Sequence, residues 1–376
     1  MTLLERILHA LAYAVQRKSA SFNTIRIDLP ITETTRDEIR RYELAIPATV
    51  RESLPIEWGA AASIPLKARI SSVFGNGSDP VLALSGDCVV DTRVLIHLCE
   101  AKGSFAFVHG DNAEQGAVLR LESPIEGVAS ASSTMVDLAQ QVLAEGTALD
   151  FGSSDFDPYV EDLRRTTPPY LFSVPDAKSK RRIERFLFWS NYKGSTDFLT
   201  RWIYPPFVWL MVQPLANRRV HPNWVTALDW VAAFLAIPFF MMGAWLPGLA
   251  LGYIMSILDS VDGKLARLTY TNSKFGTFLD HGLDIIHPPL WYLAWGYGLG
   301  GGDPKSLPFQ ASIWMFGIYV IDRILTAIFK ERTGKSIHGY TLLDERVRTV
   351  ISRRNTNMAM ITVALVYEWV AGTQGA

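Results

Sequence analysis

The chain has 376 residues, enough for about two or three domains, and its 36 basic and 37 acidic side chains leave a formal net charge of −1 at pH 7. This balance excludes a nucleic-acid-binding protein that works through bulk positive charge, so we expect no nucleic-acid partner. The composition is uneven, because the first half is polar whereas the chain becomes apolar and aromatic from about Trp202 onward. We therefore predict a soluble domain followed by an integral membrane domain.

The N-terminal run predicts an amphipathic helix rather than a signal peptide, because Glu5 comes early and no small-residue cleavage site follows. Residues 1–175 then show the alternation of an α/β domain. The expected strands are residues 24–29, 80–85, 105–108 and 117–121, and the expected helices are residues 91–103 and 135–145. The order of strand, Gly86-Asp87 and helix predicts a mostly parallel sheet with ligands at the carboxyl ends of its strands. Cys88 and Cys99 belong to no metal-binding or CxxC pattern, so we expect buried thiols and neither a disulfide nor a zinc site.

The segment PVLALSGDCVVDTRVLIHL, residues 80–98, resembles the middle of the sugar-phosphate nucleotidyltransferases. The resemblance implies that Asp87 is a metal-binding carboxylate near the nucleotide phosphates. The Gly-rich loop of that family, whose backbone N–H groups cradle the triphosphate, has no counterpart, since no glycine precedes Gly59. We therefore expect residues 1–175 to be a degenerate nucleotidyltransferase-like domain that serves as a scaffold or a regulatory module. The plainer interpretation of Asp87 is a turn residue that caps the following helix.

Residues 176–222 mix basic side chains with Trp, Tyr and Phe, which is typical of a helix lying in the membrane interface on the cytoplasmic side. The basic residues expected to face lipid head groups are Lys178, Lys180, Arg181, Arg182, Arg185 and Lys193. For the part before Ser190, a solvated charged helix that packs on the soluble domain is an equally good interpretation.

Residues 223–376 predict an all-α polytopic membrane domain. The expected spans, each close to the roughly 20 residues that a bilayer requires, are 224–245, 247–268, 276–299, 309–329 and 357–372. A sixth span would need residues 204–215 to enter the bilayer, and their three prolines argue against it. Basic residues gather in alternate connections, so the positive-inside rule predicts that these connections and the soluble domain are cytoplasmic.

Four carboxylates lie at or beside the ends of the second and third predicted spans. Asp259 and Asp262 are three residues apart, and Asp280 and Asp284 are four residues apart, so each pair shares one face of a helix. Carboxylates in such a place are costly unless they pair with cations or face water. Two helices meeting face to face would bring the four together, and oxygen ligands suit a hard divalent cation such as Mg²⁺.

The same stretch resembles the signature of the CDP-alcohol phosphotransferase (phosphatidyltransferase) family at every defined position. The matching residues are Asp259, Asp262-Gly263, Ala266-Arg267, Gly276, Asp280 and Asp284, with the intervals that the family requires. The preceding run His221-Pro222-Asn223-Trp224-Val225-Thr226 is similar to the start of that family's first membrane helix. The resemblance covers about residues 195–370 and implies attack of an acceptor hydroxyl on the β-phosphorus of a CDP-alcohol, with release of CMP.

The resemblance also implies roles for individual residues. Asp259, Asp262 and Asp280 would bind two Mg²⁺ or Mn²⁺ ions, and Asp284 would be the general base and a further metal ligand. The residues expected near the nucleotide are Gly263, Arg267, Asn223 and Thr226. The residues expected near the acceptor are Arg323, Arg353 and Arg354, of which the last two are also explained by the positive-inside rule.

These observations predict a membrane phosphotransferase of phospholipid or phospho-polyol biosynthesis. It would use a CDP-alcohol as its donor and a lipid or polyol phosphate with a free hydroxyl as its acceptor. Its other partners would be the surrounding membrane lipids. Two alternatives stay open, namely a bifunctional enzyme that also makes the CDP-alcohol and an inactive membrane scaffold. The resemblance further implies a homodimer, and we expect a bacterial or archaeal inner membrane with the active site on the cytoplasmic side.

Overall fold

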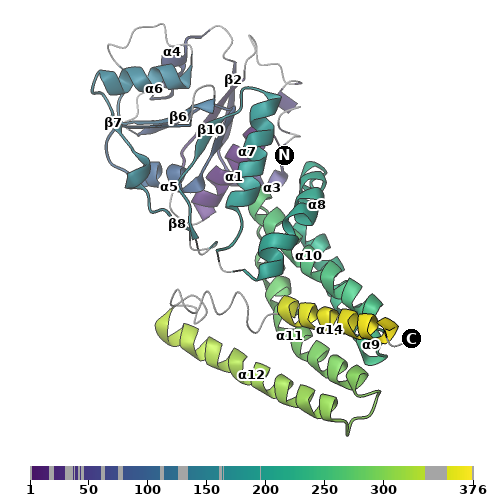
Figure 1. The fold of residues 1–376 in the computed structure, drawn as a ribbon. Helices are drawn as coiled ribbons and strands as arrows, with labels where there is room; N and C mark the ends of the chain where they lie inside the picture. Colours follow the sequence, from purple (N-terminus) through teal and green to yellow (C-terminus); the bar gives the residue numbers. More distant parts are fainter. Residues whose placement is uncertain are drawn as a thin grey trace. The chain divides into compact units, whose positions relative to one another are not determined.

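The computed structural model describes residues 2–16, 21–29, 37, 39–40, 43, 46–60, 64–74, 79–110, 114–125, 134–160, 163, 165–194, 196–334 and 354–374 (Figure 1). These residues form two compact units. The first comprises Met1–Val160 with Thr166–Ser190, and the second comprises Glu161–Arg165 with Asn191–Ala376. Each unit is described below by itself.

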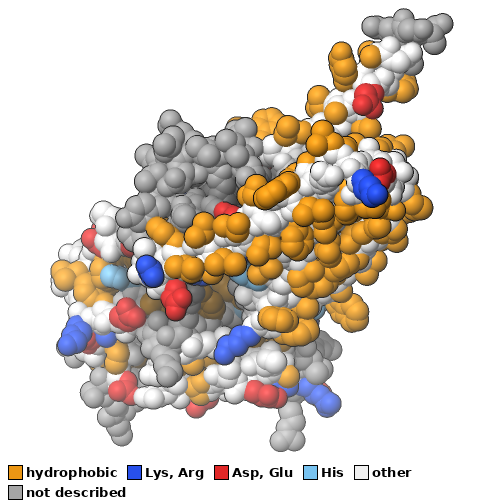
Figure 2. All heavy atoms as spheres, turned by 90° about the horizontal axis from the view of Figure 1, so that it is seen from below, with side chains coloured by type: hydrophobic (Ala, Val, Ile, Leu, Met, Phe, Trp, Pro, Cys, Tyr) orange, Lys and Arg blue, Asp and Glu red, His pale blue; other side chains and the backbone are white. Residues whose placement is uncertain are grey.

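The second unit has the apolar exterior of a membrane protein. Hydrophobic side chains gather over its helices in Figure 2, with few charged groups among them. On helix α12 (Leu307–Thr333), Trp314 is 75% exposed and Ile318 is 63% exposed. Such a surface would be unstable in water and suits contact with lipid.

The first unit is an α/β structure with short strands. Its helices are α1 (Leu3–Gln16), α3 (Ala48–Ser53), α4 (Leu66–Phe74), α5 (Thr92–Glu100), α6 (Met135–Ala144) and α7 (Ala177–Ser190). Its strands are β1 (Ile25–Leu29), β2 (Ile56–Ala60), β3 (Val81–Leu84), β4 (Cys88–Val90), β5 (Phe105–His109), β6 (Gly116–Leu121), β7 (Leu149–Asp150), β8 (Tyr159–Val160) and β10 (Leu171–Ser173), and β9 (Arg165–Thr166) lies at the boundary of the two units. The expected N-terminal helix and all the strands and helices expected before residue 146 are confirmed.

The prediction of a mostly parallel sheet is wrong. The largest sheet has the order β3-β6-β5-β7, and β6 runs antiparallel to both β3 and β5. Strands β5 and β6 follow each other through a short loop, which can join only antiparallel neighbours, because parallel neighbours need a long crossover. The parallel pairs among the described strands are β5 with β7 and β1 with β2. The strands therefore do not end at one common edge where a ligand could bind.

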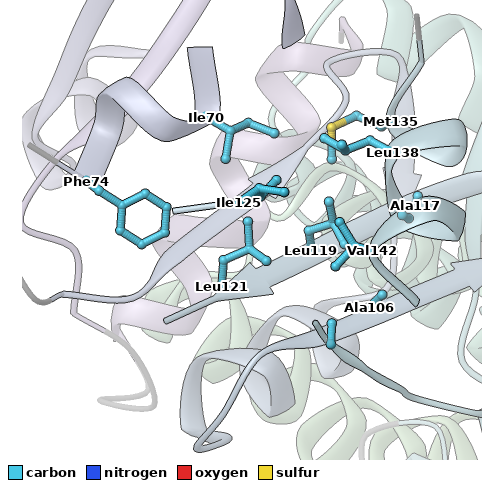
Figure 3. Packing of buried hydrophobic residues seen from close by; sticks show 12 residues of the cluster. Ile70, Phe74, Ala106, Ala117, Leu119, Leu121, Ile125, Met135, Leu138 and Val142 are labelled. Atoms are coloured by element: carbon cyan, nitrogen blue, oxygen red, sulfur yellow. The ribbon is translucent and has the colours of Figure 1, made fainter. Parts of the chain in front are cut away.

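Helices α4 and α6 cover one face of this sheet. Their apolar side chains, including Ile70, Phe74 and Leu138, pack on Leu119 and Leu121 of β6 (Figure 3). Helix α6 begins with a capping box, in which Thr134 and Asp137 each accept a backbone N–H at the helix start. On the other side of the sheet lies α5 (Figure 1), whose helical spacing of apolar residues is buried as expected.

Asp87 does not cap α5, contrary to the plainer interpretation of the sequence. The N-cap is Asp91, whose side chain accepts the N–H of Arg93. Asp87 lies in the turn between β3 and β4, and its carboxylate accepts a hydrogen bond at 2.9 Å from the hydroxyl of Ser173 on β10. The carboxylate thus ties a turn to a neighbouring strand.

Helix α7 packs on the α/β unit. Its buried residues Ile183, Leu187 and Phe188 recur at helical spacing, and Arg182 donates to Glu114 at 2.8 Å. Before Ser190, the basic segment is therefore a charged helix that packs on the α/β unit, which is the second of the two interpretations of the sequence.

From Asn191 onward, the described elements of the second unit are all helical. A π-helical turn (Leu199–Ile203) leads to α8 (Pro205–Asn217), α9 (Pro222–Met241), α10 (Trp245–Thr269), α11 (Lys274–Leu299), α12 and α14 (Arg354–Gln374). Helices α9, α10, α11, α12 and α14 form at the positions of the predicted spans, and five membrane crossings stay a prediction. Of the described helices, α9 and α12 are long and apolar enough to cross a membrane by themselves. Helices α10 and α11 carry the charged residues of the motif, and α8 has only 13 residues.

Close contacts between α9, α10 and α11 depend on glycines. A Cβ at Gly248 of α10 would lie 2.7 Å from the ring of Phe240 on α9, and a Cβ at Gly298 of α11 would lie 2.0 Å from the Phe240 carbonyl oxygen. Phe240, Trp291 and Trp295 fill the space that results. Small residues are needed wherever membrane helices approach each other this closely.

Candidate active site

A tight connection between α10 and α11 positions the motif. Helix α10 ends at Tyr270, whose φ of 54° is the left-handed conformation that stops a helix. Helix α11 starts at once with Ser273 as its N-cap, which accepts the N–H of Gly276 at 2.9 Å. The last turns of α10 and the first turns of α11 therefore lie at the same end of the helices.

Three of the four motif carboxylates converge. Asp259, Asp280 and Asp284 each offer an oxygen atom, and these atoms lie within 4.8 Å of one another. Because carboxylate oxygens are the preferred ligands of Mg²⁺ and Mn²⁺, the donor set fits a hard divalent cation. It is the one such convergence of acidic, histidine or cysteine side chains in the described part of the chain.

Asp262 lies next to this group but is held differently. It is 4% exposed, and its Oδ2 accepts a hydrogen bond of 2.6 Å from the Thr226 hydroxyl on α9. Its Oδ1 accepts the backbone N–H of Gly263. Thr226 therefore orients a motif carboxylate.

Arg354, at the start of α14, lies across the carboxylates. Its guanidinium is 3.2 Å from Asp259 Oδ2 and 3.5 Å from Asp284 Oδ1. It also donates at 2.9 Å to Nε2 of His287, a buried residue of α11. Since His287 Nδ1 lies 2.5 Å from the Leu283 carbonyl oxygen, Nδ1 carries the proton and Nε2 accepts.

The first turn of α14 is anchored to the segment before α8. Asn355, next to Arg354, donates at 3.0 Å to the buried carboxylate of Asp197. Asp197 also accepts the hydroxyl and the backbone N–H of Thr200. This arrangement fixes the direction in which Arg354 leaves its helix.

The segment before α8 also supplies a cation. Lys193, which we expected to face lipid head groups, interacts electrostatically with Asp259, Asp280 and Asp284. Nearby, Nζ of Lys264 lies 2.9 Å from the centroid of the Tyr192 ring, which holds this segment against α10.

The residues expected near the nucleotide lie around the same helix ends. A Cβ at Gly276 would lie 2.6 Å from Asn223 Oδ1, so the missing side chain lets α11 approach the start of α9. A Cβ at Gly263 would lie 3.2 Å from the Arg267 guanidinium, which packs along its own helix there. These positions leave backbone and polar groups, rather than bulky side chains, at the helix ends.

The expected acceptor residues divide into three cases. Arg354 joins the carboxylates as described, whereas Arg353 lies outside the described residues. Arg323 on α12 pairs at 2.6 Å with the adjacent Asp322 and stacks on Tyr319. The Tyr319 hydroxyl donates at 2.9 Å to the backbone carbonyl of Asp284, so α12 reaches α11 beside the proposed base.

Asp229 is a site residue that we did not predict. It lies on α9 one turn after Thr226, is 1% exposed, and interacts electrostatically with Asp259, Arg354, Asp262 and Asp284. The available signal was a lone carboxylate inside the apolar run 224–245, which is unusual unless it has a function.

An acidic cluster held at the ends of apolar helices is the arrangement with which a membrane enzyme acting on phosphate esters would hold a divalent cation. A model of the CDP-alcohol phosphatidyltransferase family matches residues 219–372. Archaetidylinositol phosphate synthase of Pyrococcus horikoshii is 35% identical over 163 residues, which are 43% of this chain and 84% of that protein. The same-named enzyme of Aeropyrum pernix is 26% identical over 169 residues, which are 43% of this chain and 83% of that protein.

A further relative, a CDP-alcohol phosphatidyltransferase class-I family protein of Schizosaccharomyces pombe, is 28% identical over 115 residues, or 26% of this chain and 29% of that protein. The chain belongs to the CDP-alcohol phosphatidyltransferase family. It is a membrane phosphotransferase of phospholipid biosynthesis that uses a CDP-alcohol donor and an alcohol acceptor, and the family uses divalent metal ions. The alternatives of a bifunctional enzyme and an inactive scaffold receive no support from these relatives.

Proposed function

We propose that the enzyme transfers a phospholipid group from a CDP-activated lipid to a hydroxyl of a phosphorylated polyol, such as an inositol phosphate. The acceptor class is supported by two relatives that are named archaetidylinositol phosphate synthase. The observation that carries the proposal is the convergence of Asp259, Asp280 and Asp284 beside the guanidinium of Arg354. A guanidinium matches a phosphate on the acceptor in both charge and hydrogen-bonding geometry.

The carboxylates of Asp259, Asp262, Asp280 and Asp284 would hold two divalent cations, Mg²⁺ or Mn²⁺. When bound, the cations neutralise the donor pyrophosphate and polarise its phosphoryl oxygens. The chain's own part is to hold the carboxylates in position. The short α10–α11 connection and the hydrogen bond from Thr226 to Asp262 serve this purpose.

Asp284 is the proposed general base. Its side chain is 59% exposed, so an acceptor hydroxyl can reach it, and Tyr319 holds its backbone carbonyl. The acceptor oxygen gives its proton to Asp284 as it bonds to the phosphorus that carries the lipid. The bond between this phosphorus and the bridging oxygen breaks, and CMP leaves with the electron pair.

At the other end of the donor, Asn223, Thr226, Gly263 and Arg267 would border the cytidine and its phosphate. The support is their position at the adjoining ends of α9, α10 and α11. On the acceptor side, Arg354 would bind the phosphate, and Arg323 and Arg353 would contribute positive charge.

The basic connections favour an active site on the cytoplasmic side of the membrane. The membrane would be a bacterial or archaeal inner membrane, and the enzyme would act as a homodimer. Residues 223–376 would form the transferase domain, and the basic segment 176–222 would link it to the first unit, on which α7 packs. Residues 1–175 would be a degenerate nucleotidyltransferase-like scaffold or regulatory domain. Its noncatalytic character is supported by the sequence, in which no glycine precedes Gly59 to form a Gly-rich phosphate loop.

The test is release of CMP by the purified full-length protein in lipid nanodiscs. CDP-archaeol and CDP-diacylglycerol would each be combined with inositol phosphate, glycerol phosphate or free inositol, with Mg²⁺ or with a chelator. We expect turnover with inositol phosphate, little with free inositol, and none after chelation. Asp284→Asn should lower kcat by about 10²- to 10⁴-fold, as loss of a general base does, whereas the exposed control Asp303→Asn should not. Equal turnover of free inositol would contradict the acceptor proposal, and full activity of Asp284→Asn would contradict the base.

A further inference from the structure

Asp229 occupies the middle of the inward face of α9. The buried residues of this helix recur every three or four positions, and those around Asp229 are Val225, Thr226, Ala232 and Ala233. All but Thr226 are apolar. A carboxylate placed among them is costly unless a cation compensates its charge.

The register of α9 against α10 places Asp229 opposite Asp259. The two helices run antiparallel and are joined by a short turn, and Thr226 of α9 bonds Asp262 of α10. One turn inward from that contact on each helix lie Asp229 and Asp259. The same register holds at the far end, where Phe240 covers Gly248.

Helix α11 is held close on the other side of Asp229. The indole N–H of Trp230 donates at 3.2 Å to the carbonyl of Leu279, the residue before Asp280. The indole N–H of Trp291 donates at 2.8 Å to the carbonyl of Ala233. Asp229 therefore lies in the seam where α9 meets the two helices that carry the motif.

One oxygen of the Asp229 carboxylate, Oδ1, is buried and has no hydrogen-bond partner among the described residues. The charged neighbours of Asp229 are Asp259, Asp262 and Asp284, which have the same sign, and Arg354. Arg354 contacts Asp259 and Asp284 directly and makes no such contact with Asp229.

We propose that Asp229 is a fifth carboxylate of the cation site and shares a divalent cation with Asp259 across the α9–α10 seam. A cation between two facing carboxylates satisfies both and removes their repulsion, and oxygen ligands suit Mg²⁺ or Mn²⁺. This inference rests on the metal site proposed above, and it adds a ligand from a helix outside the α10–α11 motif.

The test is a Mn²⁺ titration of the full-length protein in nanodiscs without nucleotide, in which electron paramagnetic resonance measures free Mn²⁺. We compare wild type with Asp229→Asn, which keeps the size of the side chain, and with Asp303→Asn, an exposed carboxylate of the same unit. We expect at least about tenfold weaker binding for Asp229→Asn, comparable to losses seen when the surroundings of a metal are altered. Asp303→Asn should bind as wild type does.

Thermal unfolding without metal shows whether the variant is folded. Because Asp229→Asn removes a buried negative charge next to three others, it should unfold at or above the wild-type temperature without metal and gain less from added Mn²⁺. If Asp229→Asn does not fold, Asp229→Ser is titrated in its place with the same expectation. Wild-type Mn²⁺ affinity and stoichiometry in the folded variant would overturn the inference and leave the metal site intact. Failure of wild type to bind Mn²⁺ would instead overturn the metal site itself.

Discussion

Replacement of Thr226 by valine removes one hydrogen bond and almost no volume. The Thr226 hydroxyl has a single proton, and it lies 2.6 Å from Asp262 Oδ2 but 3.3 Å from the Pro222 carbonyl. The proton therefore belongs to the shorter bond with the carboxylate. Because Asp262 is 4% exposed, water cannot easily replace the lost donor.

The size of the effect follows from this geometry. A hydrogen bond to a charged group contributes about 1.5–3 kcal/mol, and each 1.4 kcal/mol corresponds to about a tenfold change in an equilibrium or rate. If Asp262 must be held in one orientation to act with the other carboxylates, Thr226→Val should lower kcat/KM for CMP release by about 10- to 100-fold. The same variant should weaken Mn²⁺ binding in the titration described above.

Two variants make this assay specific. Thr226→Ser restores the hydroxyl and should recover activity to within a few-fold of wild type. Thr362→Val is the matched control, because it removes a hydroxyl of α14 that bonds Tyr253 and the Met358 carbonyl. Wild-type kcat/KM in Thr226→Val would refute the reasoning, and so would a Thr226→Ser variant as impaired as Thr226→Val.

Two further predictions concern packing and thiol chemistry. Gly298→Ala should destabilise the protein by about 3 kcal/mol in chemical denaturation, because its Cβ would lie 2.0 Å from the Phe240 carbonyl oxygen. Gly317→Ala is the control, because its Cβ would meet nothing within 4 Å, and it should be neutral. Equal stability of the two would contradict the close approach of α9 and α11. Burial raises the pKa of the Cys88 thiol to about 12 and that of Cys99 to about 11, so neither free thiol should react with a maleimide at pH 7.5 until the protein is unfolded. Rapid labelling of the native protein would contradict this expectation.

Much of the local structure could be predicted from the sequence alone, because it depends on short-range periodicity. Apolar residues at helical spacing predicted α5, and apolar runs of about the length that a bilayer requires predicted the long helices of the second unit. The intervals between Asp259 and Asp262 and between Asp280 and Asp284 predicted that each pair shares a helix face, since that follows from 3.6 residues per turn. The change from a polar to an apolar unit near Trp202 could also be predicted, because hydropathy depends only on the composition of each stretch of the chain.

The tertiary structure alone decided which distant residues meet. The pairing of β5 with β6 depends on how a loop turns and not on the strands themselves, which is why the prediction of a mostly parallel sheet failed. The contacts of Arg354 with Asp259 and of Thr226 with Asp262 join residues 95 and 36 positions apart. Asp229 faces the motif because α9 and α10 pack in one register, which is set by side chains along the whole seam and is encoded in no single interval of the sequence.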